Sequence, residues 1–188
     1  MTSKTDGAVE HFDVLVVGAG LSGIAAGYYL QTQLPHKTYA ILEGREAIGG
    51  TWDLFRYPGI RSDSDMFTLG YSFRPWQGKK SIADGASIRD YVRDTAREFG
   101  IDQKIRFLQY VKSASWSSKD SLWTLDVVVG PDKEPKRYTC NFVYVCSGYY
   151  RYDEGYTPVF PGRETFTGSV VHPQHWPEDL DYQGKRVV

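Results

Sequence analysis

The sequence contains little cysteine and no long apolar run. Its two cysteines, Cys140 and Cys146, are too few for a disulfide framework and lack the spacing of metal ligands. Two structural thiols in a reducing, cytoplasmic setting are therefore expected. No apolar stretch approaches the ~20 residues that a membrane-spanning helix needs, and the start of the chain lacks the apolar segment of a signal peptide.

An excess of charge of either sign is also missing. The chain of 188 residues has 22 Lys and Arg against 23 Asp and Glu, a net charge of −1. Surfaces that bind nucleic acid need a basic excess, so no nucleic-acid partner is expected. Aromatic residues make up 15% of the chain, which is compatible with a peripheral membrane contact.

A glycine-rich turn organises the N-terminal part of the chain. Residues 14–17 form a β-branched apolar run suited to a buried strand, and a helix is predicted from Ile24 onward. Between them, Gly18 allows a tight turn, Gly20 lets backbone approach a pyrophosphate, and Gly23 lets the helix pack on the strand. The free N–H groups at the helix start would face phosphate oxygens.

The rest of this unit supports a dinucleotide site. Ser22 lies in the first helical turn, and a second strand over residues 39–42 ends in Glu43, about 20 residues after the last glycine, where an acidic side chain accepts hydrogen bonds from a ribose. The alternative is a solvent-exposed Glu after a strand. The pattern predicts an α/β, Rossmann-like domain that binds FAD or NAD rather than NADP.

A long loop over residues 44–60 follows, with Gly49 and Gly50 before Thr51 and Trp52. Loops of this length in a compact domain are usually functional. The two glycines would let backbone lie against a flat or phosphorylated ligand with Trp52 as a wall. The alternative is a surface loop with one anchoring Trp.

Two acidic residues stand before a short helix predicted over residues 66–71. Asp65 is expected to cap that helix, whereas the role of Asp63 stays open between a cap and a site residue. A longer helix over residues 87–100 is predicted to begin with Ser87 as its cap and to end at Gly100, with its Arg and Asp residues on a solvated face.

Strands dominate the next segment, and a proline-rich stretch follows it. The pattern predicts an antiparallel meander with strands at 105–111, 113–116, 122–129, 137–140 and 142–146. Its last strand is expected to return to the parallel sheet and to stop near Gly148, where backbone could again meet a cofactor. In the stretch over 158–177, His172 and His175 lack acidic or Cys partners, so no metal site is expected.

Three patterns together resemble the type I Baeyer–Villiger monooxygenases, which are class B flavoprotein monooxygenases. The first is the glycine turn. The second is G-G-x-W-x4-[FY]-P-G-x3-D, matched from Gly49 to Asp63, and the third is F-x-G-x3-H-x3-W-[PD], matched from Phe166 to Pro177. The last two patterns are far more specific than the first.

This resemblance implies an enzyme in which NADPH reduces FAD and O₂ is activated as a C4a-peroxyflavin. Oxygen would then be inserted next to a ketone carbonyl, or a thioether or thioamide sulfur would be oxidised. By match, the residues expected to contact FAD are Ser22, Glu43, Thr51, Trp52, Asp53, Leu54, Asp63 and Val111.

The resemblance also assigns residues beyond the FAD site. Arg61, Ser62 and Asp63 would lie where the nicotinamide cofactor and the flavin meet, and Asp63 would orient the family's active-site arginine. His172 and Trp176 would lie on the linker between the two nucleotide domains, in a position suited to coupling their motion. The residues expected to serve catalysis are Asp63 and His172.

The expected organisation is a flexible tail over 1–11, the N-terminal part of a FAD domain over 12–155, a linker over 156–183, and at 184–188 the first residues of a truncated NADPH domain. A truncated chain of this kind would not turn over by itself. Two alternatives stay open, an N- or S-hydroxylating flavin monooxygenase and a non-catalytic nucleotide-binding module. The preferred substrate and the oligomeric state are also open.

Overall fold

The computed structural model describes residues 9–188, and the chain forms two compact units. The first unit contains the residues up to 50 together with 90–148, and the second contains 51–89 together with 149–188. Most of the predicted tail over 1–11 lies outside the described residues, but the first strand already begins at Glu10.

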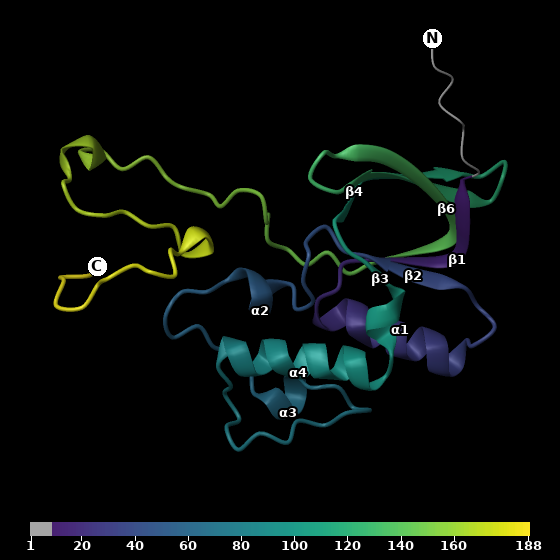
Figure 1. The fold of residues 1–188 in the computed structure, drawn as a ribbon, viewed down its shortest axis with the longest axis horizontal. Coiled ribbons are helices and arrows are strands. Elements are labelled where there is room, and N and C mark those ends of the chain that lie inside the picture. The colour runs from purple at the N-terminus through teal and green to yellow at the C-terminus, as the bar shows by residue number, and fades with distance from the viewer. Residues whose placement is uncertain (1–8) are drawn as a thin grey trace, which may run out of the picture. The chain divides into compact units, whose positions relative to one another are not determined.

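The first unit is built on one six-stranded sheet (Figure 1). The strand order is β3-β2-β1-β6-β5-β4, with parallel pairing from β3 to β6 and antiparallel pairing from β6 to β4. This confirms the predicted Rossmann-like sheet with its meander. Its elements are β1 (Glu10–Val17), α1 (Leu21–Gln33), β2 (Tyr39–Leu42), η1 (Ile101–Lys104), β3 (Ile105–Arg106), β4 (Gln109–Ser117), β5 (Leu122–Val129) and β6 (Glu134–Val145).

One long strand, β6, joins the two kinds of pairing. Residues 134–140 pair antiparallel with β5, and residues 138–145 pair parallel with β1. The prediction of two separate strands broken near Asn141 is therefore wrong. Pairing with β1 continues on both sides of this Asn, at Cys140 and at Phe142, and this keeps the backbone extended where local propensity favours a turn.

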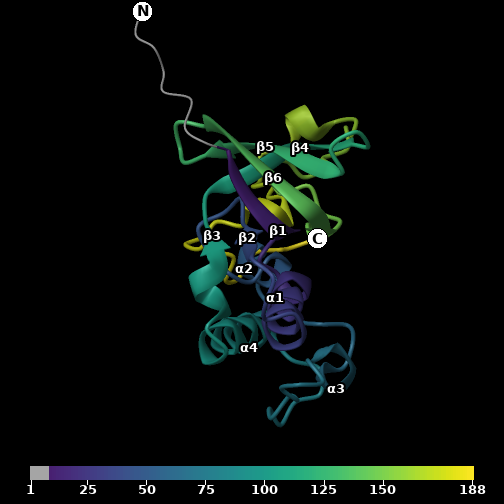
Figure 2. The ribbon, with the colours of Figure 1, turned by 90° about the vertical axis from the view of Figure 1, so that its right-hand side faces the viewer.

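The predicted strand over 105–111 is also wrong, because the chain breaks after β3. Leu108 has a positive φ of 54°, and β4 starts at the next residue. Since β3 and β4 lie at opposite edges of the sheet but only two residues apart in sequence, the sheet must curl. The N–H of Gln109 closes the curl by donating to the Glu43 carbonyl at 2.8 Å. Figure 2 shows the meander bending back over β1 and β2.

The hydrophobic core of the first unit fills the inside of this curl. Its central residue Leu15 is fully buried, and a buried side chain of this size contributes roughly 1.5–3 kcal/mol. Helix α1 packs close to the sheet, with Gly23 near Val16 and Gly27 near Ile41. The buried members of the core cluster are Leu15, Ala40, Leu42, Leu125, Val127, Tyr138 and Cys140.

Helix α4 (Gly85–Glu98) begins two residues earlier than predicted. Its cap is Asp84, whose carboxylate accepts the N–H of Ser87 at 2.9 Å and also the Ser87 hydroxyl. The prediction that Ser87 caps the helix is wrong, because Asp is also a favoured capping residue and stands three residues earlier. The predicted end at Gly100, with φ 65°, is confirmed.

The second unit has short elements and long connections. Its helical elements are α2 (Thr51–Leu54), α3 (Met66–Leu69), the start of α4, η2 (Arg163–Thr165) and η3 (Pro173–His175). The predicted cap is confirmed, since the Asp65 carboxylate accepts the N–H of Thr68 at 2.9 Å. The helix ends at Leu69 rather than at residue 71.

A polar cluster ties four strands together at one side of the core. The Arg106 guanidinium on β3 pairs with Glu10 on β1, donates to the Tyr138 hydroxyl at 3.0 Å, and lies 4.8 Å from the Phe12 ring centre. Tyr138 on β6 in turn donates to Gln109 on β4 at 2.7 Å. The hydrogen bond from Arg106 lowers the pKa of Glu10, so the carboxylate stays ionised.

Replacing Arg106 with Ala should lower the free energy of unfolding by about 1–2 kcal/mol, because a half-buried ion pair and a cation–π contact are lost together. The matched control is Arg137→Ala, which removes an exposed pair with Asp126 and should cost less than about 0.5 kcal/mol. Urea unfolding followed by circular dichroism measures both losses. Equal losses would show that the cluster does not stabilise the curl.

Asp13 gives the first unit a pH-dependent contact. Its carboxylate accepts the backbone N–H of Thr38 at 2.7 Å, the Thr38 hydroxyl and the Lys37 ammonium, in that order of effect, and its pKa is held well below the usual range. Because the pKa is depressed in the folded state, the stabilisation is present above the unfolded pKa near 3.9 and is lost as pH falls below it.

Asp13→Asn should therefore be less stable than the unchanged protein at pH 7, and the difference should shrink as the pH is lowered below about 4. Thermal unfolding between pH 3 and pH 7 checks this. A difference that stays constant over that range would mean that the charge of Asp13 has no part in holding the two strands.

Candidate functional site

The glycine turn of the first unit is as tight as predicted. Gly18 has φ 103°, and a Cβ at this position would lie 2.5 Å from the carbonyl oxygen of Cys146 at the end of β6. A Cβ on Gly23 would lie 1.9 Å from the carbonyl oxygen of Gly18. The expected turn and the expected close packing of the helix are both confirmed, because no side chain fits at either position.

Glu43 holds this turn from the end of β2. Its Oε2 accepts the backbone N–H of Ala19 at 2.7 Å, and its Oε1 accepts the N–H of Arg45 at 2.9 Å. The residue is 6% exposed, so the alternative of a solvent-exposed Glu is wrong. A carboxylate offers about four lone-pair sites, and these two bonds leave acceptor capacity for hydroxyl donors.

The Gly49-Gly50 loop lies against the same turn. The N–H of Gly49 donates to the Ala19 carbonyl at 3.1 Å, and a Cβ on Gly20 would lie 3.7 Å from the Cα of Gly50. Ala19, which is fully buried, is therefore bound through its N–H by Glu43 and through its carbonyl by Gly49. Residues 48–50 of the long loop are therefore buried next to the glycine turn.

Two arginines that sequence reasoning missed anchor this loop. Arg45 donates to the Gly50 carbonyl at 3.4 Å, and Arg93 on α4 donates to the Ile48 carbonyl at 3.1 Å. The prediction that all arginines of α4 lie on a solvated face is thus wrong for Arg93. No spacing in the sequence relates residue 93 to residue 48, so only the folded chain could reveal this contact.

The start of α1 is suited to an anion. Its cap residue Gly20 has no side chain to bond the first N–H groups, and the first turn contains no acidic residue. Ser22 is exposed in this first turn. The positive end of the helix dipole and the N–H groups of the turn favour a phosphate group at this position.

Val111 and Gly148 border the same region. Val111 lies on β4, two residues after Gln109, whose N–H binds the Glu43 carbonyl. Gly148, with φ 72°, follows Cys146, whose carbonyl lies against Gly18. The structure therefore groups the predicted cofactor residues of this unit around the carboxyl ends of β1, β2 and β6 and the start of α1: Gly18, Gly20, Ser22, Gly23, Glu43, Gly50, Val111 and Gly148.

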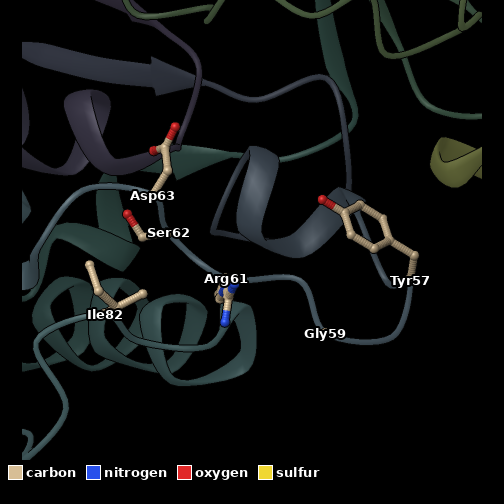
Figure 3. Close-up of a pocket in the computed structure, with 6 residues that line it drawn as sticks. All are labelled: Tyr57, Gly59, Arg61, Ser62, Asp63 and Ile82. Carbon is tan, nitrogen blue, oxygen red and sulfur yellow. The ribbon is translucent and has the colours of Figure 1, made fainter.

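The second unit contains a cavity of about 600 Å³ (Figure 3). Three consecutive predicted residues, Arg61, Ser62 and Asp63, line it together with Tyr57, Gly59 and Ile82. Ser62 is buried, and its hydroxyl accepts the N–H of Ser64 at 3.1 Å. Arg61 and Asp63 are exposed, and a cationic and an anionic residue therefore both belong to the lining of the cavity.

Polar contacts hold two of the remaining predicted residues of this unit. Asp53 on α2 is 3% exposed and pairs with Arg56 at 3.0 Å, and the Thr51 hydroxyl lies 3.4 Å from the Tyr152 hydroxyl. Trp52 and Leu54 are half-buried on the same helix. The predicted cofactor residues thus form two sets, one in each unit.

His172 orders the proline-rich segment. Its Nδ1 accepts the N–H of Gln174 at 3.1 Å, and its ring occupies the space beside Gly155, where a Cβ would lie 2.2 Å from Cε1. Gln174 is buried and donates to the carbonyls of Arg151 and Tyr152, each at 2.9 Å. Sequence reasoning missed Gln174, because it stands at a variable position of the F-x-G-x3-H-x3-W-[PD] pattern. A catalytic role for His172 stays a prediction.

Within residues 9–188, no helix has the length and apolar character to cross a membrane. The same residues contain no group of three or more His, Cys, Asp or Glu side chains placed to bind a metal ion. Burial raises the pKa of the Cys146 thiol to about 11 and also raises that of Cys140, which favours the protonated thiol over the reactive thiolate at both positions.

Comparison with known proteins gives two family matches. Residues 80–188 match the family described as flavin-binding monooxygenase-like, and residues 16–77 match the NAD(P)-binding Rossmann-like domain. The chain is 59% identical to "Putative FAD-containing monooxygenase MymA" of Mycobacterium tuberculosis and 58% identical to "FAD-containing monooxygenase EthA" of Mycolicibacterium smegmatis. Both alignments cover 95% of this chain and 36% of the relative, so the chain spans about a third of their length.

Solved structures show the same fold. An oxidized steroid monooxygenase bound to NADP is 31% identical with a TM-score of 0.75, over 91% of this chain and 32% of that protein. The open crystal structure of cyclohexanone monooxygenase is 27% identical with a TM-score of 0.77, over 92% of this chain and 33% of that protein.

Gly23→Ala should destabilise the first unit by about 2 kcal/mol or more, because the added methyl group forces α1 away from the Gly18 carbonyl. Ser22→Ala, at the exposed neighbouring position, should change stability by less than about 0.5 kcal/mol. Chemical unfolding of both variants measures the difference. A Gly23→Ala protein as stable as Ser22→Ala would contradict the close approach.

Proposed function

We propose, from the premise that this chain belongs to the flavin-binding monooxygenase-like family, that it forms the FAD-binding part of an NADPH- and O₂-dependent monooxygenase. The observation that carries the proposal is the buried Glu43, which fixes the glycine turn through Ala19 while keeping acceptor capacity. A structural role for Glu43 alone would leave two neighbouring features unexplained. These are the glycine turn and the start of α1, where no side chain caps the helix.

The residues of the first unit fit a dinucleotide. The glycine turn and the start of α1 would hold the diphosphate, Glu43 would accept hydrogen bonds from the ribose hydroxyls, and Val111 would offer backbone atoms to the adenine. Gly50 and the α2 residues Thr51 to Leu54 would continue the FAD site along the chain. An acidic residue at position 43 repels a ribose phosphate, which favours FAD over NADP at this site.

Bound FAD would supply the redox and oxygen-transfer chemistry, with NADPH as the source of electrons. The protein's own contribution in the second unit comes from the residues at the cavity. Arg61 offers a guanidinium for an anionic group of the nicotinamide cofactor, and Asp63 offers a carboxylate that can orient a cationic side chain. The buried Ser62 fixes the backbone between these two charges.

We infer a small-molecule ketone, or a thioether or thioamide, as substrate. Support comes from the two specific sequence patterns and from the similarity to a steroid monooxygenase and a cyclohexanone monooxygenase. An N- or S-hydroxylating flavin monooxygenase is the alternative. Product analysis of a chimera that joins this chain to the remainder of the EthA relative would separate them, since only Baeyer–Villiger oxidation converts a ketone to an ester. Cytoplasmic location is inferred from the two free thiols.

Glu43→Gln should weaken FAD binding by about tenfold or more, because the loss of a charge-assisted acceptor costs about 1.5–3 kcal/mol. Titration of the chain with FAD, followed by quenching of flavin fluorescence, measures this. Glu46→Gln is the control, since it removes the same charge from an exposed position three residues away.

Circular dichroism should show that both variants are folded. If the folded chain and the chimera both ignore FAD, the proposed function is wrong. If Glu43→Gln and Glu46→Gln bind FAD as tightly as the unchanged chain, the ribose role of Glu43 is wrong while FAD binding itself stands.

A further inference from the structure

A segment of the second unit combines exposed apolar side chains with basic residues. It runs from residue 66 to residue 83 and is called here the basic–aromatic loop. All its charged residues are cations, namely Arg74, Lys79 and Lys80. Phe67 is 68% exposed and Ile82 is 41% exposed. Figure 2 shows α3 and the connection that follows it.

Hydrogen bonds bring the two ends of the basic–aromatic loop together. The N–H of Met66 donates to the Ser81 carbonyl at 2.7 Å, so the first turn of α3, with Phe67, lies beside the segment that contains Lys80 and Ile82. Phe67 is 12 residues from Lys79 and 13 from Lys80 in sequence, and the fold brings it close to them, while Ile82 follows the lysines directly in the chain.

A tight turn fixes the lysines. The indole N–H of Trp76 donates to the Lys80 carbonyl at 3.0 Å, and its ring covers Gly78, where a Cβ would lie 2.3 Å from the ring. Lys79 and Lys80 follow directly and are exposed. Their backbone is held in place, so binding through both ammonium groups needs ordering of the two side chains but not of this backbone.

The acidic residues at the two ends of the loop are used for capping. The Asp65 carboxylate accepts the N–H and the hydroxyl of Thr68, and the Asp84 carboxylate accepts those of Ser87. The bonds from Ser87 lower the pKa of the Asp84 carboxyl most, and the charge of Lys80 lowers it further by a smaller amount. The 18 residues between Asp65 and Asp84 carry a net charge of +3.

A single exposed Phe needs no explanation, but exposed apolar side chains beside a group of cations are typical of proteins that bind at a lipid interface. Phe67, Lys79 and Lys80 do not line the cavity, so the cofactor role proposed above leaves them without a function, and Ile82 is the residue that the loop and the cavity share. Anionic headgroups complement the lysines, and the acyl region accepts the apolar side chains.

We propose that the basic–aromatic loop binds the surface of an anionic phospholipid membrane. Lys79 and Lys80 contact the headgroups, and Phe67 and Ile82 enter the interface. The proposal is independent of FAD binding. It gives a position and a chemistry to the peripheral membrane contact that the aromatic content of the chain allows.

Co-sedimentation of the chain with vesicles tests this. Vesicles of 30% phosphatidylglycerol in phosphatidylcholine should bind the chain at 50 mM salt, while pure phosphatidylcholine vesicles and 500 mM salt should reduce binding strongly. Lys79→Glu with Lys80→Glu should lower the partition coefficient by about tenfold or more, since each basic residue near the surface is worth about fivefold. Phe67→Ser should lower it by about threefold or more.

The matched control is Lys104→Glu with Lys119→Glu, two exposed lysines of the first unit that give the same change in net charge. This control should retain most of the binding. Equal losses in the two double variants would mean that only net charge matters and would overturn the proposal. Absence of vesicle binding by the unchanged chain, or binding to polyglutamate but not to vesicles, would overturn it as well, the latter in favour of an acidic protein partner.

Discussion

The hydrogen bonds of Glu43 are the contact on which the candidate site depends. A buried carboxylate at the end of β2 is costly unless its oxygens are satisfied, and here backbone N–H groups of Ala19 and Arg45 satisfy them. The same bonds fix the position of the glycine turn before any ligand is present. Because Gly49 also binds Ala19, the glycine turn, the end of β2 and the loop up to Gly50 are joined by hydrogen bonds. A site ordered in this way loses little entropy when a dinucleotide binds.

The curl of the sheet explains why this group is stable. Strand β6 serves the parallel and the antiparallel part at once, and the short connection after Arg106 brings β4 back to Glu43. The hydrophobic core lies inside the curl, and the cluster of Arg106, Glu10 and Tyr138 links strands that are far apart in the sheet order. The first unit therefore has its own core and its own half of the predicted cofactor residues.

The second unit is held differently. Its helices are short, and much of its order comes from single polar side chains such as Gln174, which binds two consecutive carbonyls. Segments with few regular elements and exposed surfaces are those that contact other molecules or other parts of a protein. The cavity at Arg61 and Asp63 and the basic–aromatic loop both belong to this unit. Recognition of a nicotinamide cofactor and of a lipid surface are proposed for it on these grounds.

The sequence by itself determined the parallel strands β1 and β2, the tight turn at Gly18, the close packing at Gly23, the cap at Asp65 and the family. These depend on residues close in sequence, where backbone sterics and local hydrogen bonds decide the conformation. Only the tertiary structure decided that β6 is one strand through Asn141, that Asp84 rather than Ser87 caps α4, and that Arg93 and Gln174 hold distant loops. Pairing across the sheet overrides local propensity, and the partner of a long polar side chain is set by which distant carbonyl the fold places within its reach.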